Sequence, residues 1–340
     1  MKTIMILMFV GLFLFFETEG ASNISNIVVR CKYSKKNELL MANCHGANGQ
    51  KLKTIPDNIM SEVQILKLQT NRIAKLNNRS FVMYPKIKEL LLSDNVVHTI
   101  KPGSLSVLDK LELLDLSGNA LYEVPAGLPK SLVHLNLNMN PIKRMDQLSR
   151  AVGLQVLKLS RCGLVKYPAL DVMPSLVELD VSGNDLLNDL DPVTLAATCR
   201  LSWLNVTGCT TLFQRPESRC RCLSAVKWTR NHNIQVFGMP PCPVANGTSV
   251  ANKCTAPTAL HKTTALFERC MDEWDRRNTF RWSIGLWLVI MVAIVTVPMY
   301  VRWRNQRGHS KIVRAILPST SSTVFNVRHE SSRKYLFFYM

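Results

Sequence analysis

Large apolar residues recur along the middle of the chain in one fixed spacing. The frame is L-x-x-L-x-L-x-x-N/C, with apolar residues at the first, fourth and sixth positions and Asn or Cys at the ninth. It occurs at residues 63–71, 87–95, 111–119, 132–140, 154–162, 176–184 and 201–209, so the ninth positions follow one another at steps of 24, 24, 21, 22, 22 and 25. Such regular recurrence predicts a stack of similar units, each too small to bury its own apolar face alone.

Each frame predicts one short strand. Two apolar residues that flank a variable one, such as Leu66 and Leu68, should point into the core, while the residue between them faces outward. A buried Asn at the ninth position can satisfy backbone groups of neighbouring turns and so form a ladder along the stack. Cys162 and Cys209 occupy that position in two frames, and we expect them to be buried thiols rather than catalytic nucleophiles.

The frame resembles the leucine-rich repeat, and the resemblance covers residues 57–212. It implies an α/β solenoid, a horseshoe of parallel strands whose exposed first and last cores are closed by cysteine-bearing caps. The implied caps are residues 21–56, with Cys31 and Cys44, and residues 213–254, which begin with Cys-Arg-Cys at 220–222. In the second cap the resemblance pairs Cys220 with Cys242 and Cys222 with Cys254.

Two further cysteines, Cys199 and Cys270, are left without a partner from the resemblance. Cys270 lies in residues 255–281, a stalk with no repeat pattern. It either forms a covalent dimer with a second copy of the chain or pairs with Cys199. Ten cysteines in all fit an oxidising compartment, where disulfides are stable.

Two other apolar runs predict membrane targeting. Lys2 is followed by an apolar run at residues 4–16, which predicts a signal peptide over residues 1–20. Residues 282–301 carry no charge over a length that spans a bilayer, so they predict one transmembrane helix. We therefore expect a plasma-membrane protein with residues 21–281 outside and a disordered tail, 302–340, in the cytoplasm.

Short motifs agree with this topology. Sequons for N-glycosylation occur at Asn23, Asn78, Asn205 and Asn246, all within the part expected outside. In the tail, the segment from Tyr335 to Phe338 resembles a tyrosine-based sorting signal.

Nothing in the sequence predicts catalysis. None of the seven histidines lies in H-E-x-x-H, and the chain contains no G-x-S-x-G, P-loop or G-x-G-x-x-G motif. Asp115 and Asp180 recur because they occupy a variable strand position rather than because they form a catalytic pair. We expect no enzyme activity, cofactor or metal. The net charge of +18 is spread along the chain, and an extracellular location leaves nucleic acid out of account as a partner.

A protein ligand is the better prediction. The third, fifth and seventh positions of each frame should project from the concave face. Over the first three repeats they form an apolar diagonal with a charged border, which is typical of a protein-binding surface. The predicted ligand-binding residues are Ile65, Lys67, Glu89, Leu91, Leu113 and Asp115. Alternatively, Ile65 only packs against the amino-terminal cap.

The carboxy-terminal cap offers a second candidate surface. Its basic residues are Arg215, Arg219, Arg221, Lys227 and Arg230, with only Glu217 opposing them in that segment. Such a patch could bind an anionic glycan such as heparan sulfate, or attract an acidic partner.

The order of segments resembles single-pass type I leucine-rich repeat proteins of the cell surface. These include neuronal and synaptic adhesion proteins and Toll-type receptor ectodomains without the TIR signalling domain. The resemblance implies a recognition or adhesion protein that binds an extracellular protein, for example at cell–cell contacts such as synapses. An accessory or decoy subunit of an innate-immune receptor and an anchor for matrix glycans are the alternatives.

Overall fold

A computed structural model describes residues 29–46, 49–166, 172–215, 218–243, 254 and 257–316. The predicted signal peptide, the sequons at Asn23 and Asn246, and the sorting motif at Tyr335 and Phe338 lie outside the described residues. The chain divides into two compact units after Arg276.

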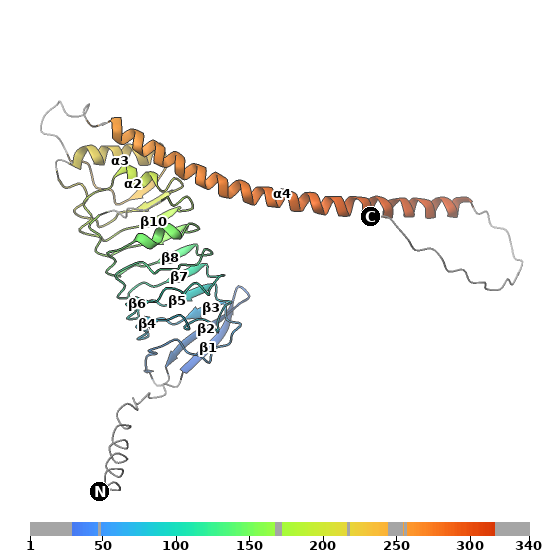
Figure 1. Ribbon diagram of the computed structural model, residues 1–340, viewed down its shortest axis with the longest axis horizontal. Helices are drawn as coiled ribbons and strands as arrows, with labels where there is room; N and C mark the ends of the chain where they lie inside the picture. The colour runs from blue at the N-terminus through green and yellow to red at the C-terminus, as the bar shows by residue number, and fades with distance from the viewer. Residues whose placement is uncertain are drawn as a thin grey trace, which may run out of the picture. The chain divides into compact units, whose positions relative to one another are not determined.

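The first unit is built on one sheet of ten strands. Seven of them repeat a single turn of the chain, and Figure 1 shows them stacked one above the next. They are β3 (Ile65–Lys67), β5 (Glu89–Leu91), β7 (Leu113–Asp115), β8 (His134–Asn136), β9 (Val156–Lys158), β10 (Glu178–Asp180) and β11 (Trp203–Asn205). All of these neighbours pair in parallel.

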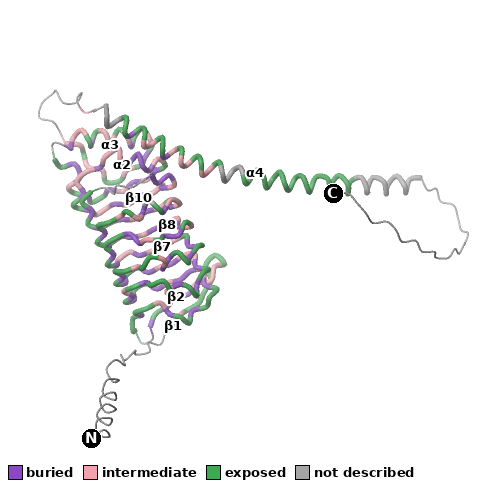
Figure 2. Tube along the Cα trace, in the orientation of Figure 1, coloured by how far each residue is buried: buried purple, intermediate pink, exposed green. Residues whose placement is uncertain are grey.

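The predicted repeat is confirmed position by position. Each of the seven strands covers the third to fifth positions of its frame. The fourth position is buried in every strand, and the third and fifth are partly exposed in most of them. One continuous apolar core therefore runs through all the repeats, as the buried interior of the stack in Figure 2 shows. Two short strands, β4 (Lys75–Leu76) and β6 (Thr99–Ile100), pair in a second sheet across the stack from β3 and β5 (Figure 1).

The asparagine ladder is also present. Asn95 is typical: its side-chain amide donates to the carbonyl of Leu68 in the preceding repeat and to that of Leu92 in its own. Its Oδ1 accepts from the backbone N–H of Ile73, 3.0 Å away. The same pattern is made by Asn71, Asn119, Asn140 and Asn184. These bonds satisfy backbone groups that the turns would otherwise bury without partners.

Hairpin β1 (Val29–Lys36) and β2 (Leu39–Gly46) forms the amino-terminal cap. It is antiparallel within itself, and β2 continues the sheet in parallel beside β3. The Cys31–Cys44 disulfide joins the two strands at a register pair. This end of the apolar core is thereby closed.

The carboxy-terminal cap consists of α2 (Pro192–Ala196), α3 (Arg219–Asn231) and β12 (Gln235–Phe237), and β12 extends the sheet in parallel beside β11. Its disulfides are Cys220–Cys254 and Cys222–Cys242, so the pairing of Cys220 with Cys242 and of Cys222 with Cys254 was wrong. Residues two apart on a helix point about 200° apart. Cys222 is fully buried and meets Cys242, which packs against the core, while Cys220 is left on the other side for Cys254.

The predicted stalk is not an open segment. It lies in α4 (Pro257–Ile316), and within the first unit this helix is tied to the last repeat by a Cys199–Cys270 disulfide. The guanidinium of Arg200 lies 3.8 Å from the ring centre of Trp274, a cation–π contact. Of the two alternatives for Cys270, the structure has the bond to Cys199 of the same chain rather than a covalent dimer. Folding of the stalk as a helix brings the two cysteines together.

We predict that the asparagine ladder carries a measurable share of stability. Replacing Asn119 with Ala leaves the N–H of Val97 buried without a partner and removes one of the two bonds to the carbonyl of Leu92, and should lower the free energy of unfolding by roughly 2–3 kcal/mol. Asn119→Cys should cost less, since Cys162 and Cys209 keep one such bond. Denaturant unfolding of residues 21–281 measures both.

Asn43→Ala is the control for this measurement, because Asn43 is an exposed strand residue outside the ladder. It should change the free energy of unfolding by no more than about 0.5 kcal/mol. Equal effects of Asn119→Ala and Asn43→Ala would contradict the role given to the ladder.

Candidate ligand-binding face

The candidate site is the strand face, which is the exposed side of the ten-stranded sheet. Side chains at the third and fifth positions of the repeats lie on it because the fourth and sixth positions point into the core. The shared register places third positions side by side across neighbouring strands, and fifth positions likewise. Sequence positions about 22 residues apart thus become direct neighbours on one surface.

A recurring turn fixes the side chains at the fifth positions of several repeats. The Oδ1 of Asp115 accepts hydrogen bonds from the backbone N–H and the hydroxyl of Ser117, at 3.0 and 2.7 Å. The same side-chain-to-backbone bond is made by Asn136, Asp180 and Asn205. Asp and Asn recur here because their short side chains cap the backbone two residues on, a local role that the sequence analysis missed.

Five of the predicted ligand residues form one compact block. In the pairing of β5 with β7, Glu89 lies opposite Leu113 and Leu91 lies opposite Asp115. Lys67 is opposite Leu91 on the other side, in β3. The two leucines are partly exposed and diagonal to one another, with charged side chains at the remaining corners. The structure therefore brings together Lys67, Glu89, Leu91, Leu113 and Asp115.

Ile65 does not belong to this surface. It is fully buried, so the expectation that it offers exposed apolar surface to a ligand was wrong. The physical reason is the cap: the Lys36 ammonium at the end of β1 lies 3.4 Å from the Glu89 carboxylate on β5, on the far side of β2 and β3 in the strand order. The end of the hairpin thus reaches past β3 to β5, which agrees with the alternative that Ile65 packs against the amino-terminal cap.

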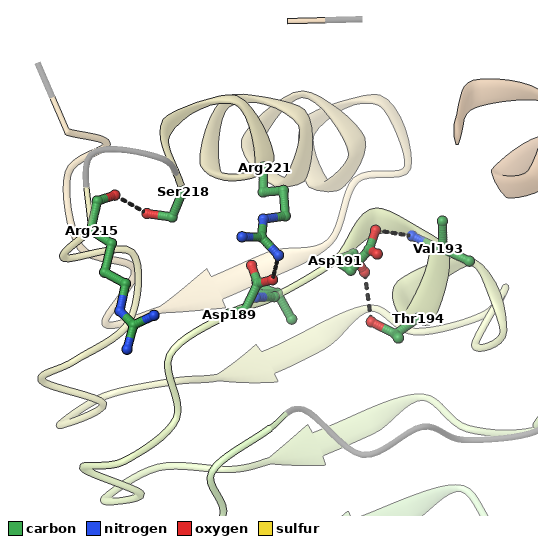
Figure 3. Close-up of polar contacts among 8 residues, drawn as sticks. Asp189, Asp191, Val193, Thr194, Arg215, Ser218 and Arg221 are labelled. Atoms are coloured by element: carbon green, nitrogen blue, oxygen red, sulfur yellow. Dashed lines mark hydrogen bonds and ion pairs between the residues drawn. The ribbon is translucent and has the colours of Figure 1, made fainter. Parts of the chain in front are cut away.

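The basic residues of the carboxy-terminal cap are partly used inside the chain. Arg221 makes an ion pair with Asp189, and Arg219 donates to the carbonyl of Pro243 at 2.8 Å. Figure 3 shows the first of these contacts beside the capped start of α2, where Asp191 accepts from the N–H of Val193. Two of the five basic side chains are thus committed to partners, which leaves a smaller basic surface than the sequence indicates.

Burial also changes the pKa of Asp189, the acid in that ion pair. Removal of water raises the pKa of Asp189, and the Arg221 charge lowers it by less. The ion pair therefore does not compensate fully for the dehydration of the carboxylate. This contact is better read as a link between α3 and the repeats than as a ligand site.

Cys162 and Cys209 are confirmed as buried free thiols. Each sulfur lies 3.3 Å from a backbone carbonyl of the preceding repeat, that of Leu137 or Val181, where Asn makes its bond in other repeats. Burial raises the pKa of Cys162 to about 11 and also raises that of Cys209. Both thiols are thereby kept in the unreactive protonated form at neutral pH.

An aromatic pair lies at the other end of the strand face. Trp203 on β11 and Phe237 on β12 have ring centres 5.4 Å apart. Phe237 is 46% exposed, and it was missed because its strand lies in the cap, outside the repeat frame. The alternation of residues 234–238 (Ile-Gln-Val-Phe-Gly) is the signal that could have indicated this strand.

Comparison with known proteins agrees with the repeat geometry. Residues 61–121 match the family described as leucine rich repeat. The first repeats of the solenoid thus resemble leucine-rich repeats, and the later repeats share their frame. The chain is also similar to mouse podocan, with 33% identity over 146 residues, which cover 40% of this chain and 24% of podocan.

Two other relatives show the same partial overlap. Rat osteomodulin is 33% identical over 147 residues, covering 41% of this chain and 34% of that protein. Leucine-rich repeat-containing protein 3 of zebrafish is 32% identical over 113 residues, covering 33% of this chain and 41% of that protein. The chain thus matches between a quarter and two fifths of the length of these relatives, and the likeness concerns part of each protein rather than whole proteins.

The second unit contains the apolar part of α4. Among the described residues, one helix segment is long and apolar enough to cross a membrane, His261–Arg304, by length and composition alone. Its large apolar side chains, such as Leu286, Trp287 and Val289, are exposed.

We predict that Cys162 and Cys209 do not react with iodoacetamide at pH 8 while the chain is folded. With the pKa of Cys162 at about 11, almost no thiolate is present at that pH, and the sulfur is also inaccessible. Mass spectrometry after labelling should find both unmodified, and both modified after unfolding in guanidinium without reductant. Rapid labelling in the folded state would show that the ninth position is open.

Proposed function

We propose that this protein recognises an extracellular protein ligand through the strand face of its first repeats, at β3, β5 and β7. The observation that carries the proposal is the block around Leu91 and Leu113. Two partly exposed leucines lie diagonally among Lys67, Glu89 and Asp115 on one rigid sheet. An apolar centre with a charged border is the usual composition of a protein-binding surface.

Preorganisation of the border supports the proposal. The Asp115 carboxylate is fixed by Ser117, and the Glu89 carboxylate pairs with Lys36. Side chains that are already ordered lose little conformational entropy when a partner binds. The exposed ion pair itself contributes little stability, so its main effect is to hold the charges in place.

We further propose that the protein is held in the plasma membrane by α4, with the repeats outside. Four disulfides support an oxidising compartment for the repeats. Exposure of the apolar side chains from Ile284 to Val301 to water is unfavourable, and insertion into a bilayer would bury them in hydrocarbon. Recognition at the surface of the same or a neighbouring cell follows from this placement.

We predict that Leu91→Asp and Leu113→Asp each weaken partner binding by at least about tenfold, or about 1.4 kcal/mol, because a charge is placed in the apolar centre of the contact. Residues 21–281, clustered on beads and screened against extracellular proteins, would supply the partner. Affinities of the variants for it are then measured by biolayer interferometry.

Leu186→Asp is the matched control, since Leu186 is 57% exposed outside the strands. It should leave binding unchanged, and circular dichroism should show that all three variants are folded. Unchanged binding by the Leu91 and Leu113 variants, or equal loss in the Leu186 variant, would move the ligand site away from these strands.

A further inference from the structure

The carboxy-terminal end of the strand face has a different chemistry from the proposed ligand block. Trp203 and Asn205 occupy the third and fifth positions of β11, so both side chains lie on this face. Phe237 of β12 is the register partner of Asn205, and its ring contacts that of Trp203. Asn205 is therefore bordered by one aromatic residue along its own strand and by a second on the neighbouring strand.

The side chain of Asn205 is oriented for modification. Its Oδ1 accepts from the backbone N–H of Thr207 at 3.0 Å, and within the described part of the chain no group accepts a hydrogen bond from its Nδ2. Asn205, Val206 and Thr207 form an N-x-T sequon. A sugar attached to Nδ2 leaves the Oδ1 bond intact, so the observed turn is compatible with the modified residue.

We propose that Asn205 carries an N-linked glycan whose first sugar rings lie on Phe237 and Trp203. In the transfer, Nδ2 forms a bond to the anomeric carbon of a lipid-linked oligosaccharide donor. The bond from that carbon to the lipid diphosphate breaks, the diphosphate leaves with the bonding electrons, and Nδ2 loses one proton.

The exposed aromatic pair provides a surface on which this glycan can pack. Phe237 and Trp203 present apolar ring surface that no described residue covers fully, and the C–H faces of sugar rings are apolar enough to pack on it. Because the glycan is covalently attached to Asn205, its first sugars lie next to the two aromatic rings. The glycan would then shield β11 and β12 from protein ligands and leave β3, β5 and β7 open.

This inference rests on the proposed placement of the repeats outside the cell. The test uses the full chain expressed in animal cells, with site occupancy read by mass spectrometry of glycopeptides. Asn78 is the internal reference, because it is an exposed sequon asparagine far along the chain from the aromatic pair. Occupancy of both Asn78 and Asn205 is expected.

Contact with the rings is tested by the rate at which a peptide:N-glycosidase releases each glycan from the folded protein. Release at Asn205 should be several-fold slower than at Asn78, and Phe237→Leu should raise the rate at Asn205 alone. After denaturation both sites should be released equally fast. Thr207→Val, which removes the sequon and keeps Asn205, identifies the Asn205 glycan by the mass that is lost.

The outcomes separate the two proposals. An empty Asn205 beside an occupied Asn78 overturns the inference and leaves the proposed function standing. The packing on the aromatic pair is overturned if Phe237→Leu does not change the release rate. If both sites are empty, the outside placement fails, and the inference fails with it.

Discussion

Backbone hydrogen bonding by the ninth-position asparagines is the constraint on which the rest of the structure depends. Each turn buries carbonyl and amide groups that the short three-residue strands cannot pair. An amide side chain carries both donors and an acceptor, so one asparagine such as Asn95 satisfies backbone groups of its own repeat and of the preceding one. Cysteine offers only a weak donor, and the two repeats with Cys162 and Cys209 keep the carbonyl contact alone.

A fixed turn of this kind determines where binding chemistry can lie. Because every repeat has the same register, its third and fifth residues add one short row to the strand face, and neighbouring rows are independent in composition. The strand face thus carries two separate surfaces. One, at the first repeats, consists of leucines and charged residues; the other, at the last repeat and the cap, consists of aromatic residues beside a sequon. The caps set the limits of the face, since Ile65 in its first row is buried at the amino-terminal hairpin while Lys67 in the same row stays partly exposed.

Features that follow from local periodicity were predictable from the sequence. The seven strands, their parallel order and the buried thiols depend on a spacing that any single repeat displays. Features that depend on contacts between distant segments were not. The burial of Ile65 requires the hairpin to reach β5, the cap disulfides depend on which side of α3 faces the core, and the Cys199–Cys270 bond depends on the stalk being a helix. The pairing of Asn205 with Phe237 in β12 also depends on a contact between distant segments.

Hydroxyl-radical footprinting of the protein with its captured partner tests the central claim most directly. The method reads the solvent exposure of individual side chains, so it reports the contact surface without any substitution. Oxidation of Leu91 and Leu113 should fall on binding, while that of Leu186 and Phe237 stays the same. Protection of Leu186, with Leu91 and Leu113 oxidised as in the free protein, would contradict a ligand site on the first repeats.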